Sequence, residues 1–295
     1  VGGYTPEKRK LRQAISLAID SQAFIDLFSQ GNGIPAQFLI PPGISGYEPE
    51  YRNPYRQHSV EKAKQLLAEA GYPGGIDRKT GERLTIFHDN TGTTAAGRQL
   101  VGLIVKQLEA VGVRVNSRPW RGIVWQDRVD KGQFQFIYYG WFADYPDPEN
   151  FVFMLYGPTR RPGPNASAYN TPEYNRLFEQ MRAMDDGPAR LAVIRRMREI
   201  AQEDVPWIFV SHDEELALTY NWLKNVKPHP ASNNSTKYLR VDGARRAALQ
   251  QAWNRPNYWP ALAMLLFLVV GSIPAVAVVR GRSRRRVRKD TGGAH

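Results

Sequence analysis

The feature that most constrains this chain is an uncharged apolar run at residues 258–279, YWPALAMLLFLVVGSIPAVAVV. As a helix its 22 residues would span roughly 33 Å, enough to cross a bilayer core about 30 Å thick. The alternative is a buried core helix beside a DNA-binding tail, but a globular helix of this length normally carries a polar face. The run therefore predicts one transmembrane helix, in which Pro274 is tolerated.

The residues that flank this run predict its orientation. Trp253, Tyr258 and Trp259 form an aromatic belt at one end. At the other end, residues 280–295 hold seven basic residues and one acidic residue, a net charge of +6. Positive flanks stay cytoplasmic, so we expect a single-pass protein of the cell membrane with residues 1–257 outside and its C-terminus inside.

The remaining +6 of the chain's net charge of +12 is spread among acidic residues. We interpret it as a mildly basic globular surface, not a nucleic-acid-binding stripe. The predicted organisation is a binding lobe at residues 1–242, a linker at 243–257, a transmembrane helix at 258–279 and a basic cytoplasmic tail at 280–295.

The chain contains no cysteine, which excludes disulfides, thiol catalysis and cysteine metal sites. Its first residues, beginning at Val1, show no basic start followed by an apolar run, so no signal peptide is visible. Because a domain outside the membrane needs an export signal, we expect the chain to be a piece of a longer protein.

Hydrophobic periodicity predicts an α/β fold. Apolar residues favour one helix at 8–29, and Ser59 has the position of a helix N-cap. Strands and helices then alternate at 84–88, 95–110, 111–115, 120–129 and 134–139, a pattern typical of parallel βαβ units. Further helices are expected at 171–184 and 188–203, strands at 207–210 and 216–220, a loop at 228–236, and a short basic helix within 243–257.

A loop at residues 140–151, GWFADYPDPENF, holds the candidate binding residues. Two prolines two residues apart stiffen it, and no basic residue occurs within ten positions of its central carboxylate. Aromatic walls with one carboxylate suit a cationic or amine-bearing ligand, because the walls exclude water and the carboxylate supplies one directional charge. The predicted ligand-binding residues are Asp144, Trp141, Tyr145 and Phe142.

Two alternatives fit the same loop. It could be an ordinary turn in which Trp141 is buried and Asp147 caps a helix with Pro148 at its first position. It could also bind Ca²⁺ through carboxylate oxygens, although two intervening prolines and no glycine hinge make this weaker. The oxygen ligands would come from Asp144, Asp147 and Glu149.

Signatures of catalysis and metal binding are weak. The histidines at 58, 88, 212, 229 and 295 include no pair at ligand spacing on one helix. Ser211, His212 and Asp213 have the residue types of a catalytic triad, but neighbours on a strand point to opposite faces and cannot form the relay. We therefore expect a binding protein and not an enzyme, with no catalytic residue, metal or cofactor.

Several stretches together resemble the extracytoplasmic solute-binding proteins of ABC importers, specifically the oligopeptide/dipeptide-binding family. Residues 10–20 (KLRQAISLAID) look like its "VRxAIxxAID" helix, and residues 63–72 (AKQLLAEAGY) are similar to its "AkxLLaeAGY" element. Residues 140–148 match its "GWxADYxDP" loop. Further matches, in family order over about residues 7–240, are at 41–43, 169–174, 190–203 and 206–208.

The resemblance implies a type II periplasmic-binding-protein fold, in which two α/β lobes close over ligand. The chain resembles the second lobe with a return stretch at about 225–245, so we expect the first lobe to be missing. In peptide-binding members, the residue matching Asp144 holds the ligand's α-amino group and the one matching Trp141 lines the same pocket. The predicted membrane helix departs from the family pattern and implies tethering beside the ABC permease subunits.

The leading hypothesis is a membrane-tethered solute-binding component of an ABC importer for peptides or related amine-bearing solutes. A ligand-sensing receptor lobe and an inactive truncated fragment are the alternatives. The solute itself stays open, since the family also includes members for nickel chelates, sugars and other compounds.

Overall fold

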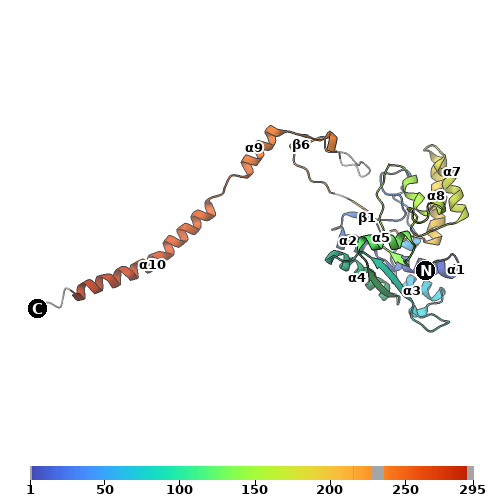
Figure 1. Ribbon diagram of the computed structural model, residues 1–295, viewed down its shortest axis with the longest axis horizontal. Helices are drawn as coiled ribbons and strands as arrows, with labels where there is room; N and C mark the ends of the chain where they lie inside the picture. The colour runs from blue at the N-terminus through green and yellow to red at the C-terminus, as the bar shows by residue number, and fades with distance from the viewer. Residues whose placement is uncertain (1, 215, 228–235, 291–295) are drawn as a thin grey trace. The chain divides into compact units, whose positions relative to one another are not determined.

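The computed structural model describes residues 2–214, 216–227 and 236–290 (Figure 1). Contacts divide these residues into two compact units, one over 2–218 and one over 219–227 with 236–290. The predicted division at residue 242 stays a prediction. Each unit is described by itself below.

The first unit contains a parallel sheet of three strands. Its strand order is β3 (Arg114–Pro119), β2 (Thr85–Asn90), β4 (Phe136–Ile137). Both neighbours of β2 run parallel to it, and the connections are α4 (Ala95–Ala110) and α5 (Gly122–Asp130). The predicted βαβ alternation and α/β class are confirmed, and α4 has the predicted bounds.

One hydrophobic core lies between this sheet and three helices. α1 (Pro6–Ala18), α3 (Val60–Glu69) and α4 bury their apolar stripes against β2. Ser59 is the N-cap of α3, as predicted, since its hydroxyl accepts a hydrogen bond from the backbone N–H of Lys62 at 3.3 Å. Its largest fully buried side chains are Leu11, Leu17, Leu67, Ile86 and Leu108.

A second core lies beneath α6 (Glu149–Val152), α7 (Pro172–Arg182) and α8 (Pro188–Asp204). α7 and α8 lie side by side (Figure 1). The irregular stretch at residues 36–40 completes this core, and short 3₁₀ turns connect its elements. The 3₁₀ turns of the two cores are Pro54–Arg56, Pro73–Gly75, Phe153–Leu155 and Gly157–Thr159.

Two buried polar clusters join the cores. Arg56 donates hydrogen bonds to the carbonyl oxygens of Phe209 at 2.7 Å and Ser16 at 2.6 Å, and burial lowers its pKa to about 10. At the end of α8, Asp204 accepts from Arg9 at 2.8 Å and from the Tyr169 hydroxyl at 2.7 Å. These contacts hold the helices of the first core against those of the second.

The predicted helix at 8–29 is wrong, because the chain forms two helices there. α1 ends at Ala18, and α2 spans Ser21–Phe28. Between them Asp20 is in extended conformation, and its carboxylate accepts from the backbone N–H groups of Gln22 and Ala23. A new N-cap therefore interrupts an apolar periodicity that continues across it.

The predicted strands are shorter or displaced. β3 begins at Arg114 and not at residue 111, since Val111 closes α4 and Gly112 has a positive φ of +93°. β4 covers two residues of the predicted 134–139. No strand forms at 207–210 or 216–220. Instead β5 (Ser211–Asp213) pairs antiparallel with β1 (Gly33–Pro35), while Leu216 and Leu218 stay exposed.

The second unit is small. β6 (Leu223–Lys224) and β7 (Arg240–Val241) pair antiparallel, and a 3₁₀ turn at Thr236–Tyr238 precedes β7. α9 (Gly243–Trp253) confirms the short basic helix predicted within 243–257. Most of the predicted loop at 228–236 lies outside the described residues.

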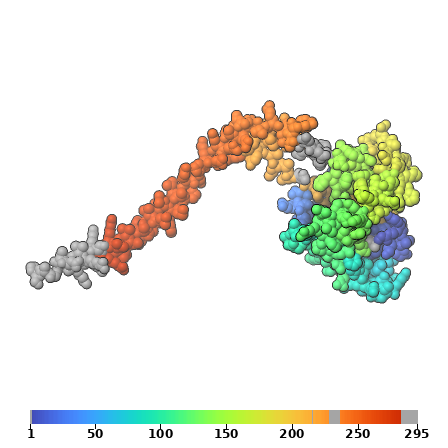
Figure 2. Space-filling view, in the orientation of Figure 1, coloured from blue at the N-terminus to red at the C-terminus, as the bar shows by residue number. Residues whose placement is uncertain are grey.

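α10 (Trp259–Asp290) contains the apolar run. Its segment Trp259–Arg282, orange to red in Figure 2, is long and apolar enough to cross a membrane. None of its most apolar window (0%) is buried. A core helix of a soluble protein would be mostly buried. The helix is therefore a candidate membrane span by length and composition.

Candidate functional site

The loop at residues 140–151 follows β4 at the carboxyl edge of the parallel sheet. Ligands of open α/β folds bind at this edge, outside the carboxyl ends of the strands. Just before the loop, the Tyr139 ring lies 6.4 Å from Trp125 and 5.9 Å from Trp207. The loop therefore begins directly after a group of packed aromatic rings.

A buried side chain that the sequence did not single out holds the first half of the loop. Asn150, on α6, accepts the indole N–H of Trp141 at 3.2 Å and the backbone N–H of Asp144 at 2.9 Å, both on its side-chain oxygen. Asn150 is buried, so these hydrogen bonds form away from competing water. One amide oxygen therefore positions two of the predicted binding residues.

An ion pair holds the second half. Arg190 of α8 binds both carboxylate oxygens of Asp147, at 2.9 and 2.8 Å. The same carboxylate accepts the backbone N–H of Glu149, the first residue of α6, at 2.8 Å. Burial alone would raise the pKa of Asp147, but hydrogen bonds from Arg190 and from the Glu149 backbone lower it below its usual value.

The four predicted binding residues of this loop differ in their exposure and in their contacts. The Asp144 carboxylate is exposed, and within the described residues it has no hydrogen bond or ion pair. Phe142 is 77% exposed, and Tyr145 is exposed with its hydroxyl donating to Glu149. Trp141 is half-buried and packs edge-on against Phe153 at 5.3 Å. Three residues therefore face outward, and Trp141 ties the loop to the second core.

The structure also bears on the two alternatives for this loop. The capped turn is present only in part. Asp147 accepts the backbone N–H of Glu149, but α6 begins at Glu149 with Pro148 as its N-cap residue, and Trp141 is only half-buried. For the calcium alternative, the carboxylate of Asp147 is engaged by Arg190, and that of Glu149 by Tyr145. Only Asp144 of the three carboxylates stays open among the described contacts.

A charged cluster occupies the same sheet edge at the end of β2. The buried carboxylate of Asp89 accepts hydrogen bonds from Arg118, from the Trp120 indole at 2.7 Å and from Arg128 at 3.2 Å. Asp89 pairs in register with Ile137 of β4, three residues before Gly140. Asp89 was not among the predicted binding residues, although an aspartate at the end of an apolar strand is a usable signal for such a cluster.

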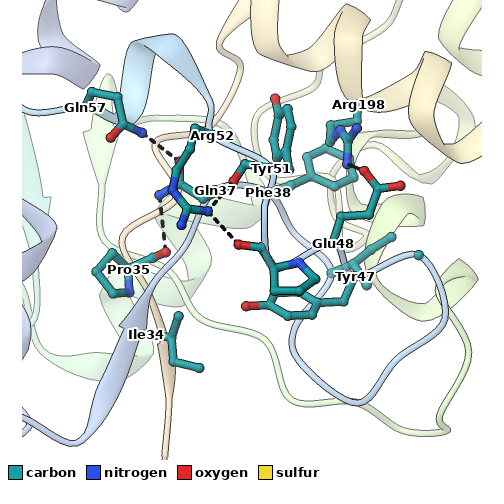
Figure 3. Close-up of a pocket in the computed structure, with 13 residues that line it drawn as sticks. Ile34, Pro35, Gln37, Phe38, Tyr47, Glu48, Tyr51, Arg52, Gln57 and Arg198 are labelled. Carbon is teal, nitrogen blue, oxygen red and sulfur yellow. Dashed lines mark hydrogen bonds and ion pairs between the residues drawn. The ribbon is translucent and has the colours of Figure 1, made fainter.

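A cavity of about 280 Å³ lies elsewhere in the first unit, between residues 34–57 and α8 (Figure 3). None of the four predicted binding residues lines it. Its charges are largely paired, since Glu48 binds Arg195 and Arg198, and Arg198 lies over the Tyr51 ring at 3.7 Å. The cavity therefore offers few open polar groups to a ligand, and the loop stays the stronger candidate.

The side chains of Ser211, His212 and Asp213 on β5 follow the expectation that neighbours on a strand point to opposite faces. The Ser211 hydroxyl donates to Asp213 at 2.8 Å on one face of β5. The His212 ring instead packs against Tyr47, with the ring centroids 6.2 Å apart. The histidine therefore does not stand between the other two.

Comparison with known proteins identifies the family. Residues 5–163 match the sequence pattern of bacterial extracellular solute-binding proteins, family 5 Middle. The chain belongs to this family. Its match begins in α1 and extends through the sheet, the loop and α6.

Curated relatives support the assignment. The chain is 29% identical to heme-binding protein A of Haemophilus influenzae over 79% of this chain and 42% of the relative. It is 28% identical to the dipeptide-binding protein of Escherichia coli over 69% of this chain and 37% of the relative. The chain thus spans about two fifths of the length of these relatives.

Solved structures of similar fold include periplasmic binding proteins. The DppA periplasmic binding protein of Helicobacter pylori, in complex with a peptide, matches 79% of this chain and 44% of its own with a TM-score of 0.69 at 24% identity. HbpA2 of Haemophilus parasuis matches 71% of this chain and 40% of its own with a TM-score of 0.62 at 28% identity. The predicted periplasmic-binding-protein lobe therefore agrees with both comparisons.

Proposed function

We propose that this chain is the membrane-tethered solute-binding component of an ABC importer, and that it binds peptides or related amine-bearing solutes outside the membrane. The observation that carries the proposal is the exposed Asp144 carboxylate, without a partner among the described contacts, on a loop that Asn150 and Arg190 hold in place. A carboxylate held in this way can accept a charge-assisted hydrogen bond from a ligand ammonium group without first giving up a bond of its own.

The neighbouring rings support an amine as the ligand group. Phe142 and Tyr145 are exposed on either side of Asp144 in the loop, and the Trp141 ring is partly open. An ammonium group is attracted both by a carboxylate and by aromatic faces. Heme, named for one relative, carries two propionates that Asp144 would repel. The charge of the loop therefore favours peptides over heme.

The remainder of the proposal concerns location and partners. α10 would cross the cell membrane once, with the first unit outside and the basic residues after 280 in the cytoplasm. Tethering keeps the binding lobe near the membrane in which permease subunits of the importer lie. Support comes from the apolar span, the arginine-rich flank and the family of the lobe.

The test is calorimetric titration of di- and tripeptides into the full chain in nanodiscs. N-acetylated peptides and hemin are titrated in parallel. We expect free peptides to bind and acetylated peptides to bind at least about ten-fold more weakly, because acetylation removes the charge that Asp144 recognises. Equal affinity for both peptide forms, or binding of hemin alone, would contradict the proposal.

A further inference from the structure

Lysine and arginine are unevenly distributed between the parts of this chain. Residues 1–218 hold equal numbers of basic and acidic residues and are neutral overall. Residues 219–227 and 236–258, which we call the juxtamembrane segment, hold seven basic residues and one acidic residue, a net charge of +6. The positive charge that we expected to be spread over a globular surface is therefore concentrated immediately before α10.

The described part of this segment is folded around stacked aromatic rings. Trp222 is only 7% exposed, because its ring stacks on Tyr220 at 4.2 Å and lies 5.3 Å from Trp253 of α9. The Trp222 carbonyl oxygen accepts the backbone N–H of Asp242, which is itself the N-cap of α9. The β6–β7 pair and α9 are thus held together through one tryptophan.

The outer rings of this cluster stay exposed. Tyr220 is 61% exposed and Trp253 is 58% exposed, and both belong to side chains that prefer the interface between water and lipid. Tyr258 and Trp259 at the start of α10 are exposed too. A soluble surface rarely shows four such rings beside a cluster of arginines without a partner to cover them.

Chain length limits how far this surface can lie from the bilayer. Five residues, 254–258, separate the end of α9 from the start of α10. Fully extended, they reach about 20 Å. If α10 spans the membrane, Trp253 therefore lies within about 20 Å of the interface, close enough for its neighbours to contact lipid headgroups.

We propose that the juxtamembrane segment binds the surface of an anionic bilayer, with Tyr220 and Trp253 in the headgroup region and the basic side chains of α9 on lipid phosphates. The proposal rests on the membrane span of the proposed function. The segment then holds the part of the chain that leads to the binding lobe at the membrane surface. The positive-inside rule counts basic residues within about 20 positions of the membrane ends. The flank at 239–258 holds four basic residues and the tail at 280–295 holds seven, so the rule still favours a cytoplasmic C-terminus.

The test places an environment-sensitive dye on single cysteines of the full chain, which has no native cysteine. Gln250→Cys reports on α9, Ala261→Cys on the start of α10 and Lys64→Cys on α3 of the first unit. Labelled chains are reconstituted into nanodiscs of phosphatidylcholine alone, or of equal parts phosphatidylcholine and phosphatidylglycerol, that carry a nitroxide lipid. Dyes in contact with lipid are quenched.

We expect quenching at residue 250 in the anionic nanodiscs to approach that at 261 and to exceed that at 64. Raising salt from about 0.1 to 1 M, which shortens the Debye length from about 10 to about 3 Å, should reduce quenching at residue 250. Each basic residue beside an anionic bilayer favours association roughly five-fold. Replacing Lys227, Arg246 and Arg255 with glutamine should therefore lower the association of α9 by about 100-fold.

Two further outcomes are informative. Trp253→Ser should reduce quenching at residue 250 without changing it at residue 261. Absence of quenching at residue 250 while residue 261 is quenched would overturn this inference alone and would point to a protein that covers the aromatic rings. Absence of quenching at residue 261 would overturn the membrane span, and with it the tethering in the proposed function.

Discussion

Arg190 on α8 binds both carboxylate oxygens of Asp147, 43 residues earlier in the chain, at 2.9 and 2.8 Å. This bidentate pair connects the helix pair α7–α8 to the candidate binding loop. Arg190 is buried and also donates to the Met181 carbonyl oxygen at 3.2 Å, so the guanidinium has little freedom to move. The loop therefore takes its position from the second core and not from its own sequence alone.

Asp147→Asn should destabilise the lobe by about 2 kcal/mol, since a buried arginine loses its bidentate partner in a site that is partly open to water. Because the pKa of Asp147 is lowered in the folded state, its contribution is present above the unfolded-state pKa and is lost as pH falls through the folded-state value. Urea unfolding of the full chain in detergent, followed by tryptophan fluorescence, measures the effect.

The matched control for this substitution is Asp186→Asn. Asp186 also bonds Arg190, at 2.6 Å, but its side chain is 67% exposed. An exposed pair contributes at most about 1 kcal/mol, so this variant should unfold nearly like the parent chain. Equal destabilisation by both substitutions would show that the Asp147 pair has no special role in holding the loop.

Asn150→Ala should loosen the loop, because the Trp141 indole and the Asp144 backbone N–H both lose their acceptor. We expect a loss of about 1–3 kcal/mol and faster hydrogen exchange of the amides in residues 140–151. Asn150→Asp keeps an acceptor oxygen at the same place and should retain most of the protection. If alanine leaves exchange in the loop unchanged, Asn150 does not hold it.

Asp144→Asn should weaken peptide binding about ten- to a hundred-fold, since it removes a charge-assisted contact worth roughly 1.5–3 kcal/mol. Calorimetric titration of peptides into the full chain in nanodiscs measures the change. Asp185→Asn, which removes an exposed carboxylate outside the loop, is the charge control and should leave affinity unchanged. Unaltered binding by the Asp144 variant would remove this residue from the site.

His88→Phe should flatten the acid side of the stability profile. Burial lowers the pKa of His88 to about 4, below its unfolded value near 6.5. The unfolded chain therefore binds the extra proton first, and stability falls as pH drops from 6.5 to 4, by up to about 3 kcal/mol from this residue. Among the described residues neither ring nitrogen of His88 has a hydrogen-bond partner, so replacing the ring with phenylalanine removes no hydrogen bond seen there.

Urea unfolding of the two proteins at pH 7, 5.5 and 4 tests this expectation. As pH falls, the free energy of unfolding should decrease more for the parent than for His88→Phe. A difference that stays constant across this range would mean that His88 does not titrate between its folded and unfolded values.

The features that could be predicted from the sequence are those that depend on neighbouring residues. α4 has the expected bounds because its apolar residues recur at helical spacing, and Thr94 caps it through a hydrogen bond to the Gly97 N–H at 3.1 Å. The parallel sheet followed from alternating strands and helices. The break between α1 and α2 was not predicted, because the capping residue Asp20 lies within an apolar periodicity that continues on both sides of it.

The amino-acid sequence by itself determined the α/β alternation, the apolar run that became α10, and the composition of the loop at residues 140–151, since each depends on neighbouring residues and their spacing. Only the tertiary structure decided that Trp141 packs inward while Phe142 and Asp144 face outward, and that Asn150 and Arg190 hold them so. Those contacts join separate elements, and no local propensity encodes which buried arginine will meet which carboxylate. The same limit applies to Trp222, whose ring is buried only because α9 and the β6–β7 pair fold around it.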